Sequence, residues 1–467
     1  MSSKLVRSII VLAVGLIIWM LPVPVGVKIE AWKLLAIFVA TIVGFILQPL
    51  PIGALAFVAL TTAAFSKALT LPQILTAFSD GTTWLIVSAF LFARAFIKTG
   101  AGQRVSFLLI KHFGDSTLKL AYVLMISDIF IAPATPSNTA RAGGMFYPIV
   151  RSLASSYKSE PGASAKRIGS FLVPVVFQGD CIISGLFLTS MAGNPLMAKF
   201  VNDVAGINIS WGTWLLAACV PVIMALIVIP FFMYKFEKPE ITKTPEAKSM
   251  AIDELRKMGP MKDTEKYLFA IFLSALLLWA TSQLNGLNAT LVALMAVSAM
   301  LITGVLEWND IVGEKGAWDT MFWMGGLICL AGFLNKLGLI PWFAKQVSAS
   351  LVGVPWQYAL AVIVFVYIFS HYAFASLTAH IAAMFSAFYA VAVAVGSPPY
   401  LAAFCLFTAN SITQSLTHYA VGAAPIYFGA GYMSLSRWWT LGLLIALLNI
   451  VVQIFGGAVW WKILGFW

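Results

Sequence analysis

Residues 127–148 read SDIFIAPATPSNTARAGGMFYP and hold the side chains best suited to bind an anion. Two prolines interrupt a helix here, and the run Ser137, Asn138, Thr139 can cap a new one. Arg141 follows within one turn. A helix start offers unpaired N–H groups and the positive end of its dipole, and short polar side chains add donors. The stretch predicts an anion site on a broken helix; the alternative is a kinked helix whose hydroxyls satisfy their own backbone.

A second copy of this pattern begins 239 positions later. Ser376, Leu377 and Thr378 align with the first motif, and His380 stands where Arg141 stood. In both copies the basic residue follows the motif serine by four positions, which places the two on one helix face. Two matched motifs in matched positions favour a paired binding site over two kinked helices.

Each motif is followed by another interrupted apolar run. The first contains Thr189 and Gly193, and the second contains Thr417 and Gly422. We expect these breaks to meet the motifs near the membrane midplane, as paired broken helices do in many secondary transporters. The predicted substrate-binding residues are Ser137, Asn138, Thr139, Ser376, Leu377, Thr378, Thr189, Gly193, Thr417 and Gly422.

The composition predicts a polytopic membrane protein. Of 467 residues, 61% are hydrophobic and only 10% are charged, too few to cover a soluble protein of this length. Most of the Lys and Arg residues behind the net charge of +11 fall in loops that we assign to the cytoplasm. This positive-inside pattern predicts a cytoplasmic N-terminus and needs no nucleic-acid partner. The four cysteines lack metal or redox spacing, so neither a metal nor a cofactor is predicted.

The apolar runs predict an all-α protein with about eleven transmembrane helices and two re-entrant hairpins. A charged segment, 235–266, is expected to be a cytoplasmic linker with an amphipathic helix near 246–258. It separates two halves, 1–234 and 267–467, that read as inverted-topology repeats. The hairpins are expected at about 118–155, from inside, and 356–396, from outside. The spans are expected at about 8–22, 32–48, 52–66, 82–98, 168–200, 211–234, 267–283, 288–306, 319–336, 400–433 and 438–460.

These features resemble the divalent anion:sodium symporter (DASS) family of di- and tricarboxylate carriers. A Ser-Asn-Thr run at each hairpin tip is the hallmark of that family; residues 137–139 match it in full, whereas Leu377 replaces the asparagine of the second run. The breaks also depart from the Thr-Pro and Pro-Asn patterns of sodium-coupled members. The chain is therefore more similar to the branch that exchanges dicarboxylates such as 2-oxoglutarate, malate and succinate without sodium.

The resemblance also implies an architecture. It implies an elevator-type transporter, with a scaffold from the spans between 8 and 98 and between 267 and 336. The moving transport domain would comprise both hairpins and the spans within 168–234 and 400–460. It further implies a homodimer in the cytoplasmic membrane of a bacterium.

Arg141 and His380 suggest how an exchanger could work without sodium. We hypothesise that they supply the positive charge that bound sodium supplies in symporters. The alternatives are that Arg141 forms a structural ion pair with Asp180 or Asp128, and that His380 is a satisfied core histidine.

Other functions are also open to test. A sodium- or proton-coupled symporter of the same family is the nearest alternative. An intramembrane enzyme is not expected, because the sequence has neither a His-Glu-x-x-His run nor a Gly-x-Ser-x-Gly run. A channel is a third possibility, against which the paired broken helices favour alternating access.

Overall fold

The computed structural model describes residues 3–351 and 353–467, and within them every regular element is helical. This confirms the all-α prediction. By length and composition, eight helical segments in this range could cross a membrane. They are Ile29–Leu47, Leu71–Thr99, Thr117–Ala134, Trp211–Phe236, Lys315–Lys336, Trp356–Ala373, Leu377–Ala394 and Leu435–Ile463.

The long helices of the first half begin and end close to the expected positions. The structure adds two short elements that the sequence reading left as loops: α4 (Leu71–Leu75) and α6 (Ala101–Phe113). The others are α1 (Ser3–Met20), α2 (Ile29–Leu47), α3 (Ile52–Phe65), α5 (Gly81–Thr99) and α11 (Trp211–Phe236).

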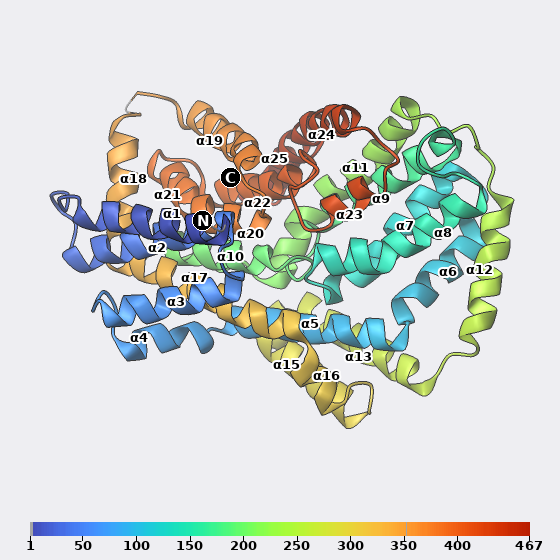
Figure 1. Cartoon of the computed structure of the whole chain (residues 1–467), viewed down its shortest axis with the longest axis horizontal. Helices are drawn as coiled ribbons and strands as arrows, with labels where there is room; N and C mark the ends of the chain where they lie inside the picture. Colours follow the sequence, from blue (N-terminus) through green and yellow to red (C-terminus); the bar gives the residue numbers. More distant parts are fainter. Residues whose placement is uncertain (1–2, 352) are drawn as a thin grey trace.

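The linker forms the expected amphipathic helix, α12 (Pro245–Met258), which packs along α6 (Figure 1). Arg104 of α6 forms a buried ion pair with Glu265 at the start of the next helix, with Nε and Oε2 2.5 Å apart. The second half continues with α13 (Asp263–Ala280), α15 (Ala289–Ile302), α16 (Trp308–Gly313), α17 (Lys315–Lys336) and α18 (Leu339–Ala349).

The two hairpins are built from nearly the same series of elements. Helices α7 (Thr117–Ile131) and α19 (Trp356–Ser370) each have 15 residues and start 239 positions apart. Each continues into a three-residue 3₁₀ turn and a short loop that holds the motif serine. A π-helical stretch and an α-helix then follow, and in the second hairpin the four-residue helix Leu377–His380 comes before them. The return arms are η3 (Thr139–Phe146) with α8 (Tyr147–Ser156), and α20 (Leu377–His380) with η6 (Ile381–Phe385) and α21 (Ser386–Ala394).

The runs after the hairpins are broken where the glycines and prolines predicted. The first is divided into α9 (Gly169–Ile183) and α10 (Gly193–Ala205), and the second into α22 (Pro399–Thr413) and α23 (Ala424–Gly429). We call residues 184–192 the first break and residues 414–423 the second. The chain closes with α24 (Leu435–Asn449), a π-helical turn and α25 (Gly456–Ile463).

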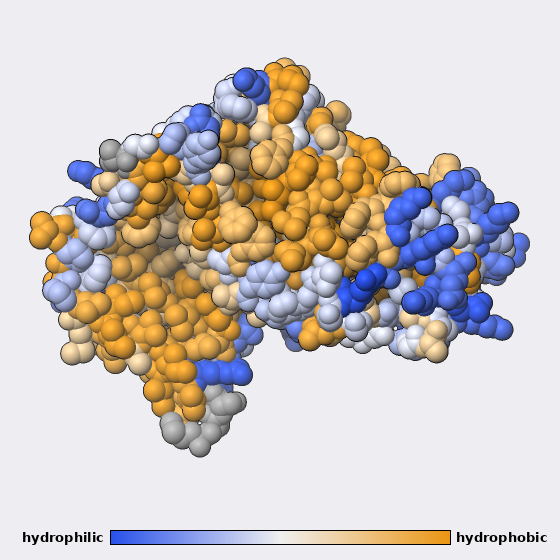
Figure 2. Space-filling model, turned by 90° about the horizontal axis from the view of Figure 1, so that it is seen from above, coloured by the Kyte–Doolittle hydropathy of each residue, from blue (hydrophilic) through white to orange (hydrophobic). Residues whose placement is uncertain are grey.

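The surface has the character of a membrane protein. Large hydrophobic side chains are exposed on most long helices, including Leu12 at 65%, Phe65 at 89% and Leu277 at 64%. Strongly hydrophilic residues gather at the end of the molecule that carries α12 (Figure 2).

In the interior, Gly325 of α17 lies so close to the backbone of Ala77 that no side chain would fit between them.

Candidate functional site

The two motif serines perform the same task in the two hairpins. Ser137 Oγ accepts a hydrogen bond from the N–H of Ala140 at 3.2 Å, and Ser376 Oγ accepts one from Ala379 at 3.3 Å. Each serine thereby caps the helix that returns from the tip. A helix start has further N–H groups without intrahelical partners, which can receive an anion.

Within each motif the middle residue points into the protein and the outer two remain accessible. Asn138 is 4% exposed and Leu377 is 6% exposed, whereas Thr139 is exposed and Ser137 is half-buried. Ser376 and Thr378 are also half-buried. The replacement of asparagine by Leu377 therefore changes the interior beneath the second tip, while both hydroxyl groups of that motif are kept.

Asn138 connects the first tip to both breaks through a residue that the sequence reading missed. Its Nδ2 donates to Gln414 Oε1 at 2.8 Å, and Gln414 Nε2 donates to Ser184 Oγ at 2.7 Å. All three residues are buried. The sequence feature that could have revealed Gln414 is its position: an amide side chain directly after the apolar helix 399–413, at the start of the second break.

Two glycines bring the second break and the start of α10 against the hairpin of the other half. A side chain on Gly422 of the second break would overlap the Thr139 hydroxyl, and one on Gly193 of α10 would overlap Ile381. Gly422 is exposed, like Thr139, whereas Gly193 is buried. The first contact joins two predicted residues, and the second joins Gly193 to a residue that was not predicted.

The two predicted threonines of the breaks lie deeper. Thr189 donates from Oγ1 to the carbonyl of Pro133 at 2.6 Å and accepts from Trp211 Nε1 at 3.2 Å. Thr417 is buried, and its hydroxyl has no hydrogen-bond partner among the residues that the structure describes. Thr189 therefore ties the first break to its own hairpin, and the Thr417 hydroxyl is free to bind a ligand or water.

Arg141 is enclosed by the chain. Its side chain is 0% exposed, with Nε 2.5 Å from Asp128 Oδ1 and Nη2 2.8 Å from Asp180 Oδ1. Nη1 donates to the carbonyls of Thr135 at 2.9 Å and Ser190 at 2.8 Å. The structure thus favours the ion-pair alternative, with both carboxylates as partners, and every guanidinium nitrogen is engaged within the protein.

His380 has a different environment. It is fully buried, its Nε2 lies 2.9 Å from Ser370 Oγ, and its Nδ1 has no partner in the described part of the chain. The rings of Tyr367, His371 and Phe374 surround it, with centroid distances of 4.4, 4.8 and 4.9 Å. His371 in turn reaches the Ala420 carbonyl in the second break at 2.9 Å. The role of His380 in charge compensation stays a prediction.

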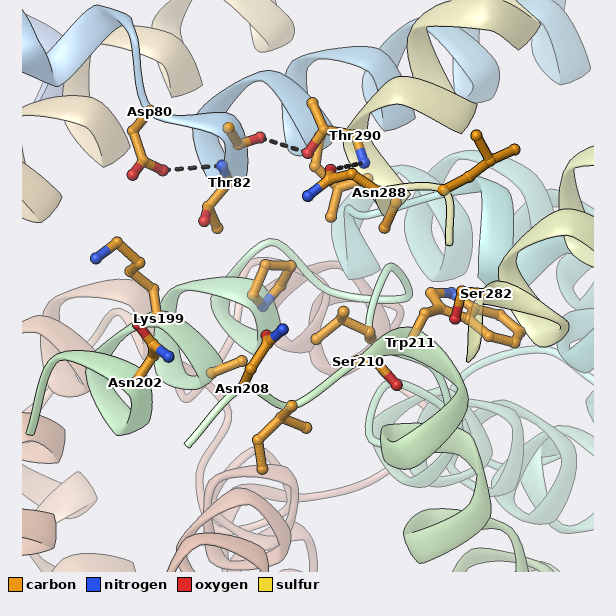
Figure 3. A pocket seen from close by; sticks show the side chains of 18 of the residues that line it. Asp80, Thr82, Lys199, Asn202, Asn208, Ser210, Trp211, Ser282, Asn288 and Thr290 are labelled. Atoms are coloured by element: carbon orange, nitrogen blue, oxygen red, sulfur yellow. Dashed lines mark hydrogen bonds between the residues drawn. The ribbon is translucent and has the colours of Figure 1, made fainter. Parts of the chain in front are cut away.

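A polar cavity of about 630 Å³ lies beside the site, between the start of α5, the turn before α15, and helices α10 and α11 (Figure 3). Asp80 and Thr82 line one wall, and Lys199 and Asn202 line the opposite wall. Neither motif lines it. Leu188 of the first break lines it, as does Trp211, which donates to Thr189.

Within the described residues, no group of three or more His, Cys, Asp or Glu side chains could hold a metal ion. The chemistry of the site is therefore that of hydroxyls, amides and helix starts, which suits a carboxylate or another oxyanion.

The names of similar proteins agree with a site for a carboxylate or another oxyanion. The sequence profile described as "Sodium:sulfate symporter transmembrane region" matches residues 2–467. The chain is 47% identical to "Putative malate transporter YflS" of Bacillus subtilis, over 100% of this chain and 98% of the relative. It is 44% identical to "Dicarboxylate transporter 1, chloroplastic" of Arabidopsis thaliana, over 98% and 82%. It is 38% identical to "Inner membrane protein YbhI" of Escherichia coli, over 100% and 99%.

Two solved transporters share the fold at low sequence identity. The YdaH transporter of Alcanivorax borkumensis gives a TM-score of 0.59 at 12% identity, covering 99% of each chain. MtrF of Neisseria gonorrhoeae gives 0.56 at 11% identity, covering 98% of this chain and 94% of that one.

Proposed function

The chain belongs to the sodium:sulfate symporter family, the divalent anion:sodium symporters, and from this we propose that it transports dicarboxylates of the malate, succinate and 2-oxoglutarate class. One observation carries the proposal: two serine-capped helix starts recur in matched hairpins, and each hairpin touches the broken run of the other half, Thr139 at Gly422 and Ile381 at Gly193. Relatives named as malate and dicarboxylate transporters support the substrate class. We infer from the same relatives that the protein is a transporter rather than an enzyme.

The substrate carboxylates would bind the accessible hydroxyls of Ser137, Thr139, Ser376 and Thr378 together with the N–H groups of the two helix starts. Leu377, whose side chain is buried, could contribute only its backbone. Asn138 and Gln414 would hold the first tip in place from beneath. The remaining contacts would come from the breaks, through Thr189, Gly193, Thr417 and Gly422.

We propose sodium-independent antiport as the transport mode. The buried Leu377 side chain supplies no oxygen ligand for a cation beneath the second tip. Arg141 occupies the corresponding interior of the first half and is held by two carboxylates. A fixed arrangement of this kind leaves no mobile cation whose release would let the empty carrier return.

The proposed motion is an elevator. The two hairpins, α9–α11 and α22–α25 would move as a transport domain against a scaffold of α1–α5 and α13–α17. The polar cavity in Figure 3 lies along this boundary, with Asp80 on the scaffold side and Lys199 on the moving side. We further propose a homodimer in the bacterial cytoplasmic membrane with the N-terminus inside.

Counterflow in proteoliposomes tests the function. Uptake of labelled malate, succinate or 2-oxoglutarate should require an unlabelled dicarboxylate inside and should be the same with and without sodium. Sulfate and citrate, tested as competitors, should displace the label less than dicarboxylates do. Uptake into empty vesicles driven by an imposed sodium or proton gradient would instead identify a symporter of the same family.

A further inference from the structure

Three buried charges form a closed group beneath the first motif. Asp128 of α7 is 3% exposed, Asp180 of α9 is 1% exposed, and Arg141 of η3 is 0% exposed. Arg141 reaches Asp128 through Nε at 2.5 Å and Asp180 through Nη2 at 2.8 Å. The two carboxyl groups share this one guanidinium, so that their charges act on each other.

The charges of this triad do not balance if all three groups are ionised. Two carboxylates and one guanidinium sum to one negative charge, in a place where all three side chains are buried. An unmatched charge in such a setting is costly, and two carboxylates that share one guanidinium cannot both ionise cheaply. Such a pair is accommodated when one member carries a proton.

Among the described residues, no neighbouring group supplies the missing positive charge. The other titratable side chains at the triad are the Cys181 thiol on α9 and the Tyr427 hydroxyl on α23, which donates to the Ala142 carbonyl at 3.0 Å. Both are neutral in their ordinary form. Of the helices packed on α7, α6 has its buried Arg104 paired with Glu265 and carries Lys111 and His112 at its last turn, and α11 carries its one cation, Lys235, at its last turn.

We propose that the triad is a proton-binding site, in which Asp128 holds one proton as a carboxylic acid and Asp180 is the ionised partner. The assignment follows from the donors that face each group. Asp180 receives Arg141 Nη2 and also lies 3.4 Å from Asn138 Nδ2, whereas Arg141 Nε is the one cationic or amide nitrogen that reaches Asp128 within the described part of the chain. More donors stabilise the anion at Asp180, so the proton resides on Asp128.

The site adjoins the proposed substrate path through Asn138, so this inference rests on the proposed function for its transport assay. A retained proton keeps the triad neutral, which lets a dianion bind above it without repulsion from below. The proton stays on the pair throughout the cycle and therefore is not a coupling ion. Exchange at equal pH on both sides moves no protons across the membrane.

The transport test measures dicarboxylate homoexchange at equal internal and external pH over an alkaline series, where the substrate is already a full dianion. The wild type should lose up to about tenfold in rate per pH unit once the triad loses its proton. Asp128→Asn imitates the protonated acid and should keep exchange while abolishing this alkaline loss. The double variant Asp128→Asn/Asp180→Asn leaves Arg141 unpaired and should lose exchange at every pH.

Two results would overturn the proposal in this assay. The first is an Asp128→Asn variant that is slower at every pH but keeps the alkaline decline of the wild type. The second is a pH-sensitive dye inside the vesicles that reports proton movement in step with exchange.

An infrared measurement tests the proton without transport. Purified wild-type protein at neutral pH should show the carbonyl stretch of a carboxylic acid, shifted by ¹³C-aspartate labelling and absent in Asp128→Asn. Lack of a labelled acid band in folded, monodisperse wild type would refute the proton site. If the band is present but no dicarboxylate exchanges, the proposed function fails and the proton site stands.

Discussion

Gly422 and Thr139 lie in direct contact although they belong to opposite halves of the chain, so that a side chain on Gly422 would overlap the Thr139 hydroxyl. The contact places an accessible glycine of the second break against the accessible threonine of the first motif. A dicarboxylate bound to Thr139 would thus also lie against the backbone of the second break.

Substitution of Gly422 by alanine should therefore impair transport more than folding. The added methyl must displace Thr139 or the break, at a cost of about 1–3 kcal/mol, which corresponds to about 5- to 150-fold in affinity. We expect a higher KM for the dicarboxylate in counterflow. Gly429→Ala, at a position with no atom near the added methyl, is the matched control and should behave as wild type. Equal effects of the two variants would contradict the contact.

The bond between Asn138 and Gln414 should be visible as a coupling energy. Asn138→Leu copies the second motif and leaves the buried Gln414 Oε1 without its donor, which should cost about 1–3 kcal/mol of stability. Gln414→Leu should cost a similar amount because Asn138 and Ser184 both lose a partner. In a double-mutant cycle of thermal unfolding, the two losses should fall short of additivity by about 0.5–3 kcal/mol. Strict additivity would show that the bond contributes nothing.

Much of this architecture was predictable because it is encoded locally. The prolines before Ser137 end one helix and the serine begins the next, so the hairpin and its capped tip follow from neighbouring residues. The repeat at a spacing of 239 then located the second hairpin. The glycines and prolines in the two broken runs likewise interrupt their helices through local backbone effects.

The features of the site that were missed depend on contacts between distant segments. The bond from Asn138 to Gln414 joins residues 276 positions apart. The two carboxylates around Arg141 come from different helices, and the sequence offered Asp128 or Asp180 as partners without showing that both bind at once. Short helices such as α4 and α6 were missed because their apolar residues are too few for a span.

The two motif serines should be needed for more than capping. Ser137→Ala and Ser376→Ala each remove a cap, which costs about 1 kcal/mol of stability, and they also remove a proposed donor to the substrate. We expect both to raise the KM for dicarboxylate in counterflow. Ser210→Ala removes the cap of α11, where Ser210 Oγ accepts from Thr213 at 3.1 Å, and provides the control. If all three variants lose stability equally and none changes KM, the serines only cap.

Removing one partner of the ion pair between Arg104 and Glu265 should strongly destabilise the end of the molecule that carries α12. Their side chains are 8% and 1% exposed, and Arg104 Nη1 also donates to the Gly259 carbonyl at 2.9 Å. The pair joins α6, which leads into the first hairpin, to α13, which begins the second half. Removing one partner leaves a buried charge unpaired, so Arg104→Met or Glu265→Leu should destabilise the protein by about 3–5 kcal/mol.

The double variant Arg104→Met/Glu265→Leu should recover most of that loss, because an apolar pair can replace a buried ion pair at little cost. Lys266→Ala is the control: it breaks the exposed pair with Asp263, whose side chains are 58% and 77% exposed, and should change stability by less than about 1 kcal/mol. Thermal unfolding in detergent measures all four variants. A double variant as unstable as the single ones would mean that α6 and α13 are held by the packing and hydrogen bonds of these side chains, not by the balance of their charges.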